Sequence, residues 1–87
     1  MKKYYMRLVD RLFKVLCIYE ENYDNFVQYT NSLSFELSAN SEFEEICQIM
    51  FKLKALTLNE ITHSEVRKTV LDCISIIDRI LSNWTGD

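Results

Sequence analysis

The amino-acid sequence predicts an all-α fold, a compact antiparallel helical bundle of three or four helices. The 87 residues include one glycine and no proline, whereas strands and hairpins depend on these residues for their turns. Leucine, glutamate, lysine and methionine, which favour helices, are plentiful. Apolar residues also recur every three or four positions, the period of an amphipathic helix. At this length we expect a single helical-bundle domain, residues 1–87.

The first predicted helical stretch runs from about residue 3 to residue 33. Residues 20–25 are its weak point, because asparagine and aspartate are poor in helix interiors. A break there gives a helical hairpin and four helices in all. The apolar seam crosses the weak point without a change of phase, which favours one continuous helix. The seam consists of Tyr5, Val9, Leu12, Leu16, Tyr19, Tyr23 and Phe26.

A connection is predicted near residues 34–41, where serine and asparagine are frequent. These side chains bond to the nearby backbone and compete with helix formation. Ser41 and Glu44 then have the spacing of a capping box, the reciprocal pair that starts a helix. We therefore expect the next helix over residues 42–56.

The last predicted helix, residues 63–84, has the clearest local signal. Thr62 and Glu65 form a second capping-box pattern, and Ile61 and Val66 have the spacing of a hydrophobic staple around it. Gly86 follows the helix at the place where a glycine commonly ends one. Short connections between amphipathic helices make sequential helices antiparallel neighbours, so an up-down bundle follows.

The sequence lacks the residue patterns that enzyme active sites commonly require. No glycine-rich phosphate loop exists, and His63 is the only histidine, placed in a solvated first turn. The three cysteines, Cys17, Cys47 and Cys73, fall on apolar stripes and are predicted to be buried, reduced thiols. No C-x-x-C pattern accompanies them. We therefore expect no enzyme activity, no metal site and no cofactor.

The sequence also lacks signals for export or membrane insertion. No stretch approaches the roughly 18 apolar residues that a membrane span requires. Lys2 and Lys3 resemble the start of a signal peptide, but Arg7 and Asp10 interrupt the apolar region that should follow. We expect a cytoplasmic protein that does not contact a membrane.

Charge is segregated along the chain. Residues 1–19 carry five basic residues and one acid, whereas residues 20–45 carry seven acids and no base. One interpretation is that the basic and acidic segments attract each other within the protein, and that some of the acids occupy helix N-termini, where negative charge is favourable. The other is an acidic surface that recognises a basic partner. The candidate partner-binding residues are Glu20, Glu21, Asp24, Glu42, Glu44 and Glu45.

The basic residues near the N-terminus share one helix face. Lys3, Arg7, Arg11 and Lys14 are spaced by four, four and three positions. Such a face can contact phosphates. Because the isoelectric point is about 5.1 and no basic recognition helix exists, we expect no direct binding to nucleic acid.

Apolar residues off the main stripes exceed what a narrow core needs. In a small bundle some of them should be exposed, and exposed apolar residues rimmed by charge are typical of a protein interface or a homodimer. They are Tyr4, Val15, Ile18, Tyr29, Ile49, Leu71 and Ile76.

Three segments carry a resemblance to a known class of proteins. They are the opening Tyr4-Tyr5-x-Arg7-Leu8-Val9, the segment Glu45-Ile46-Cys47-x-x-Met50-Phe51, and Glu65-Val66-Arg67 in the capped last helix. With its length and acidity, the chain resembles small all-α bacterial immunity proteins of the colicin D type and of contact-dependent inhibition systems. The resemblance implies an antitoxin whose acidic surface covers the basic active site of a toxin nuclease.

A second resemblance rests on Tyr4-x-Met6-Arg7-Leu8, Glu36-Leu37-Ser38-x-Asn40 and Leu53-x-x-Leu56-Thr57-x-Asn59. These segments are similar to the haemolysin-expression-modulator family of nucleoid-associated proteins. That resemblance implies a small regulator that binds a nucleoid or transcription protein. The sequence therefore predicts a non-enzymatic protein-binding module, first an immunity protein with a basic toxin as partner. The alternatives are such a regulator and a self-associating structural helical module.

Overall fold

Four α-helices form the described part of the chain in the computed structural model, which covers residues 2–39, 44–58 and 61–83. The helices are α1 (Lys2–Glu21), α2 (Tyr23–Ala39), α3 (Glu44–Leu58) and α4 (His63–Ser82). Within these ranges no strand occurs, so the predicted all-α class is confirmed.

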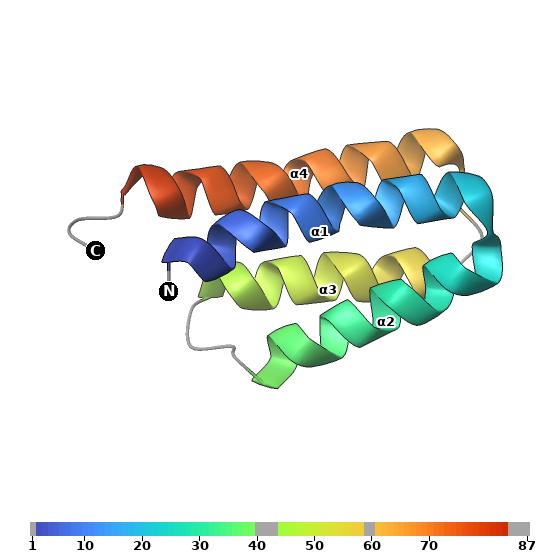
Figure 1. The fold of residues 1–87 in the computed structure, drawn as a ribbon, viewed down its shortest axis with the longest axis horizontal. Helices are drawn as coiled ribbons and strands as arrows, with labels where there is room; N and C mark the ends of the chain where they lie inside the picture. The colour runs from blue at the N-terminus through green and yellow to red at the C-terminus, as the bar shows by residue number, and fades with distance from the viewer. Residues whose placement is uncertain (1, 40–43, 59–60, 84–87) are drawn as a thin grey trace.

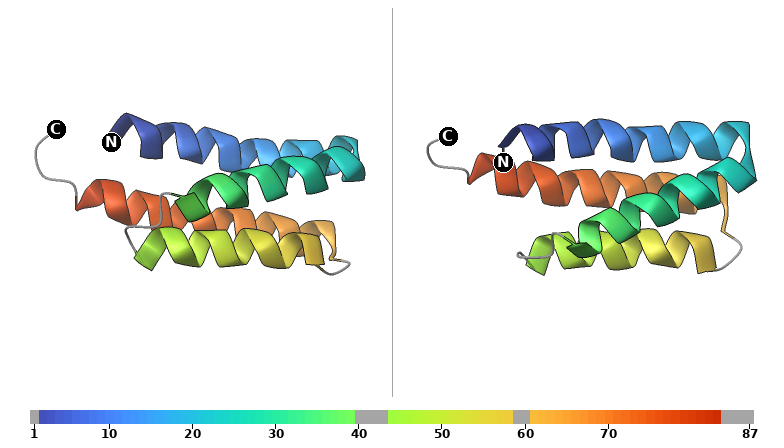
Figure 2. Two further views of the ribbon diagram at one scale, coloured as in Figure 1. Left: turned by 90° about the horizontal axis from the view of Figure 1, so that it is seen from below. Right: turned by 60° about the horizontal axis from the view of Figure 1, so that its bottom comes forward.

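The helices form an up-down bundle in which each one packs against two neighbours (Figure 1). α1 lies next to α2 and α4, and α3 lies next to the same two helices, whereas the described backbones of the diagonal pairs are farther apart. α2 crosses obliquely, lying beside α1 where it begins and nearer α3 where it ends (Figure 2). The bundle measures 40 × 21 × 16 Å along its principal axes. We call the end where α1 stops and α2 starts the hairpin end.

The first helical stretch is broken at Asn22, so the predicted alternative of four helices with a break within residues 20–25 is confirmed, and the continuous helix that the seam favoured was wrong. Asn22 closes α1, because its backbone N–H donates to the Ile18 carbonyl at 2.9 Å. It also opens α2, because its side-chain Oδ1 accepts from the backbone N–H of Asn25 at 3.0 Å. A one-residue break hardly shifts the apolar period, so the seam gave no sign of it. Tyr23, assigned to that seam, is 48% exposed.

The predicted connection at residues 34–41 was also wrong over its described part, because α2 continues to residue 39. Ser34 is buried and donates its hydroxyl to the Met50 carbonyl of α3 at 3.4 Å. Ser38 donates to the Phe35 carbonyl within its own helix at 2.6 Å. Both hydroxyls thus bond to backbone without interrupting the helix.

Downstream, α4 begins at the predicted residue 63, whereas α3 ends at Leu58, two residues later than predicted, and α4 ends at Ser82, two residues earlier than predicted. In α4 the capping box is confirmed, because the Thr62 hydroxyl accepts from the Glu65 N–H at 3.2 Å and the Glu65 carboxylate accepts from the Thr62 N–H at 3.3 Å. Ser41, Glu42 and Gly86, which the predictions also used, lie outside the described residues.

One apolar core runs through the bundle, with Leu12, Phe26, Leu53 and Val70 among its fully buried side chains. Several residues thought surplus to the core belong to it: Val15, Ile49 and Ile76 are buried, Tyr4, Ile18 and Tyr29 are partly buried, and Leu71 is 45% exposed. No described helix has the length and apolar character needed to cross a membrane.

The cysteine prediction holds for one of three residues. Cys73 is buried, Cys47 is partly buried and Cys17 is exposed. Cys17 follows the buried Val15 by two positions, which turns its side chain about 200° away from the core side of α1. The expectation that Cys17 lies in the core was therefore wrong.

Candidate partner-binding surface

The six candidate acids do not form one patch. Glu20, Glu21 and Asp24 lie at the hairpin end, on the right in Figure 1, whereas Glu44 and Glu45 begin α3 at the opposite end. The 17 residues of α2 separate the two groups by about 25 Å at 1.5 Å per residue. Glu42 lies outside the described residues. The acidic run in the sequence thus becomes two separate groups in space.

Helix polarity explains three of the acids. Asp24 lies in the first turn of α2, and Glu44 and Glu45 lie in the first turn of α3. The partial positive charge of a helix N-terminus stabilises a carboxylate in that position. These three residues therefore have a structural role that needs no partner.

The other two acids are placed against the helix dipole. Glu20 and Glu21 occupy the last turn of α1, and that turn contains no basic residue. The carbonyl groups at a helix C-terminus carry partial negative charge, so carboxylates there destabilise the helix. The dipole of α1 therefore does not account for Glu20 or Glu21.

Glu20 has a partner across the bundle. Its Oε1 lies 2.8 Å from Nε2 of His63, at the start of α4. The Tyr19 ring stacks on the same imidazole, with centroids 5.9 Å apart and an interplanar angle of 29°. The Tyr19 hydroxyl donates to the Ile61 carbonyl at 3.1 Å. Glu20 thus takes part in a contact that joins the end of α1 to the start of α4.

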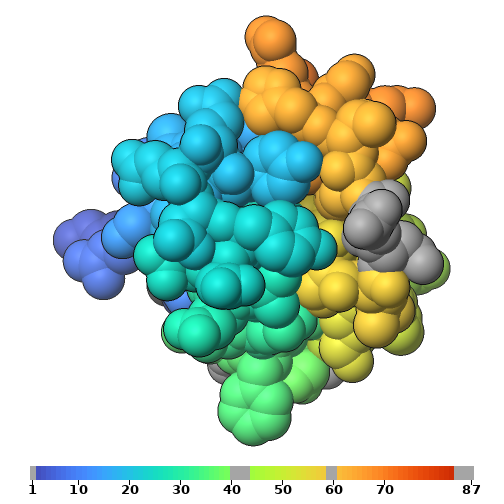
Figure 3. Space-filling view, turned by 90° about the vertical axis from the view of Figure 1, so that its right-hand side faces the viewer, coloured from blue at the N-terminus to red at the C-terminus, as the bar shows by residue number. Residues whose placement is uncertain are grey.

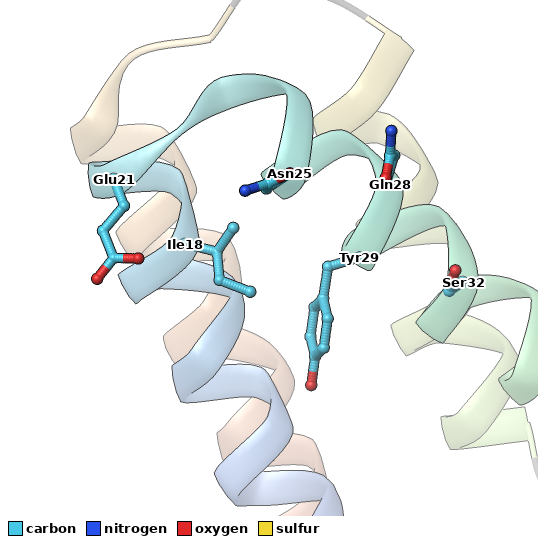
Figure 4. Close-up of a pocket in the computed structure, with 6 residues that line it drawn as sticks. All are labelled: Ile18, Glu21, Asn25, Gln28, Tyr29 and Ser32. Carbon is cyan, nitrogen blue, oxygen red and sulfur yellow. The ribbon is translucent and has the colours of Figure 1, made fainter.

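Glu21 lies instead at a groove between α1 and α2, and no ion pair of the described residues includes it. The groove is open and has a volume of about 380 Å³. Figure 4 shows Ile18 and Tyr29 projecting into the space between the two helices, with Glu21 at the end of α1. The lining residues are Ile18, Glu21, Asn25, Gln28, Tyr29 and Ser32.

Beyond Tyr29, the seam between α1 and α2 is polar. Arg11 forms an ion pair with Glu36, and Lys14 places its ammonium 5.4 Å from the centroid of the Tyr29 ring. Burial alone would lower the pKa of Arg11, but hydrogen bonds to Tyr29 and Glu36 raise it. Burial, followed by the charge of Glu36, raises the pKa of Tyr4. At least one base of the N-terminal segment therefore pairs with an acid of residues 20–45 within the protein.

The hairpin end presents the α1–α2 corner to solvent. In Figure 3, which views this end, residues of the corner form one side of the surface and the start of α4 forms another. Glu20, Glu21 and Asp24 are all exposed there. We refer to these three residues as the acidic corner. Since no lysine or arginine occurs from residue 15 to residue 51, α2 contributes no cation to it.

An apolar surface on α2 and α3 was not predicted. Phe35, Phe51 and Leu58 are 77%, 63% and 77% exposed. Phe35 follows Ser34 and Phe51 follows Met50, and Ser34 bonds to Met50 across the two helices. Leu58 follows Thr57, which bonds to Asn31 of α2 at 3.0 Å. In two antiparallel helices, the residue after one that faces the partner helix is turned about 100° away from the contact. The turn is toward the same side of the pair for both helices. The three side chains therefore share one outward face.

The remaining histidine, cysteine and acidic side chains are of the types that bind metal ions. Among the described residues, no group of three or more histidine, cysteine, aspartate or glutamate side chains could hold a metal ion. Burial raises the pKa of the Cys73 thiol to about 12, so the thiol is protonated at neutral pH.

Comparisons with known proteins found no matching family model, no similar curated protein and no similar solved structure.

Proposed function

We propose that this protein is a non-enzymatic binding module of the cytoplasm, an immunity or antitoxin protein that neutralises a basic toxin. In this proposal the acidic corner covers the positively charged active site of the toxin, which is a nuclease. The observation that carries the proposal is the position of Glu21, which sits at the end of α1, where a carboxylate disfavours that helix, and which no ion pair of the described residues includes. Residues that reduce stability are commonly retained for function.

Electrostatics gives such a corner two effects. A concentrated negative surface attracts a positively charged partner from a distance and raises the association rate. It also opposes the approach of acidic proteins, which gives specificity. Because the acidic corner is exposed, association should weaken as salt is added.

The test uses the protein encoded by the adjacent gene, expressed with and without this chain. We expect this chain to relieve its toxicity and to bind it in a salt-dependent manner. Glu21→Lys and Asp24→Lys should mainly slow association, as rim charges do. Asp10→Lys is the matched control, because Asp10 is exposed in the middle of α1. Equal binding by wild type and both corner variants would contradict the proposal, as would an adjacent product that is not toxic.

A second candidate function is self-association through the outward face of α2 and α3. Phe35, Phe51 and Leu58 support it, because large exposed apolar side chains on one face of a protein are typical of interaction surfaces. Sedimentation equilibrium should then give a dimer, and Phe35→Glu with Phe51→Glu should return it to a monomer. A monomer at all concentrations would exclude this candidate.

A further inference from the structure

We infer that the groove between α1 and α2 binds an arginine side chain of a basic protein partner. The inference deepens the proposed function and rests on it. It concerns the six residues that line the groove at the hairpin end (Figure 4).

The groove lining is suited to a side chain that is apolar along its length and charged at its tip. Ile18 and the ring of Tyr29 supply apolar surface on either side of the space between the helices. Glu21, Asn25 and Ser32 supply polar groups around it. Long basic side chains bury their methylene groups against apolar surface and keep the cationic group at polar partners. The open volume of about 380 Å³ accommodates a side chain rather than a whole helix.

Electrostatics places the cationic group at the Glu21 end of the groove. Glu21 is the one charged residue that lines the groove, and the last turn of α1 holds no base that could neutralise it. At the other end, the Lys14 ammonium already lies over the Tyr29 ring. Because Lys14 repels a second cation, an incoming side chain is directed toward Glu21.

The number of acceptors favours arginine over lysine. At the Glu21 end of the groove, the Glu21 carboxylate and the side-chain carbonyl of Asn25 can accept hydrogen bonds, whereas Gln28 and Ser32 lie farther along α2 (Figure 4). A guanidinium offers five donors in a planar fork, can engage a carboxylate with two of them and stacks on aromatic rings. An ammonium offers three donors on a strongly hydrated point charge. Arginine therefore uses this lining more fully.

The experiment is a ¹⁵N-NMR titration of the full chain with three small probes: acetyl-arginine amide, acetyl-lysine amide and acetyl-citrulline amide. Citrulline keeps the shape of arginine without its charge. We expect the arginine probe to shift the amide signals of residues 18–32, the lysine probe to shift them less, and the citrulline probe to leave them unchanged.

Variants of the same chain test the assignment to the groove. Glu21→Gln should weaken arginine binding by about tenfold, the order expected for one hydrogen bond to a charged group. Asn25→Ala should weaken it too without opening the helix, because Asn25 contacts the cap at Asn22 through its backbone N–H only. Asp10→Asn, the control, should bind as wild type does.

Three results would overturn the inference: no shifts with arginine, equal shifts with arginine and lysine, or shifts that also spread to Glu44 and Glu45. The outcome is separable from that of the proposed function. If the arginine probe binds but the adjacent gene product does not, the groove remains a binding site and the immunity proposal fails. If the adjacent product binds and Glu21→Gln changes nothing, the immunity proposal remains and the groove inference fails.

Discussion

Glu21→Gln should make the free protein more stable. The carboxylate lies in the last turn of α1, which contains no base, and no ion pair of the described residues includes it. Glutamine has nearly the same helix propensity as glutamate, so the substitution changes charge and little else. Removal of a charge that opposes the dipole is worth about 0.3–1 kcal/mol at an exposed position. For a domain of this size that raises the Tm by about 1–8 °C.

The assay is urea unfolding followed by circular dichroism, at low and at high salt. The gain in free energy of unfolding should shrink at high salt, because ions screen the dipole interaction. Asp24→Asn and Glu44→Gln are the matched comparisons, since both acids lie in first turns. Each of these two substitutions should lower the free energy of unfolding by about 0.3–1 kcal/mol, because it removes a negative charge that the helix dipole stabilises. A loss of stability in Glu21→Gln equal to that in Asp24→Asn would refute the reasoning.

Three further predictions concern the rest of the bundle. A thiol reagent should label Cys17 promptly in the native protein and Cys73 only after unfolding. Burial raises the pKa of the Cys73 thiol from 9.0 to about 12. The free energy that the protonated Cys73 thiol contributes to folding is therefore complete below pH 9 and is lost as the pH rises toward 12. A double-mutant cycle of Glu20→Gln and His63→Ala, read by urea unfolding, should give a coupling of about 0.2–1 kcal/mol, as expected for an exposed pair, and a value of zero would remove this contact as a link between α1 and α4. Thr30→Val should raise the free energy of unfolding by up to about 1 kcal/mol, because the buried Thr30 hydroxyl has no hydrogen-bond partner among the described residues, and a loss of stability would show that the hydroxyl is bonded.

The sequence predicted those parts of the fold that local chemistry determines. The capping box of Thr62 and Glu65 needs only residues three positions apart, so its pattern was sufficient. The break at Asn22 was harder, because asparagine can end one helix and begin the next without altering the apolar period. Ser34 was misread because its hydroxyl bonds to Met50, a partner on another helix.

The candidate site was predicted in its charge but not in its arrangement. The run of acids from Glu20 to Glu45 is visible in the sequence, yet the α1–α2 hairpin carries its two halves to opposite ends. The groove was missed because its lining comes from two helices whose crossing the sequence does not specify. Ile18 and Tyr29 appeared only as surplus apolar residues, and Asn25 carried no signal beyond its poor helix propensity.

The most direct test of the central claim compares the two ends of the bundle in one toxin-neutralisation experiment. Glu21→Gln and Glu44→Gln remove one carboxylate each, at the hairpin end and at the start of α3. With both variants confirmed as folded, Glu21→Gln should bind the adjacent gene product more weakly and protect cells less, while Glu44→Gln protects them as wild type does. Full protection by Glu21→Gln would contradict the assignment of Glu21 to the toxin interface, and an equal loss in both variants would contradict the claim that the hairpin end binds the toxin.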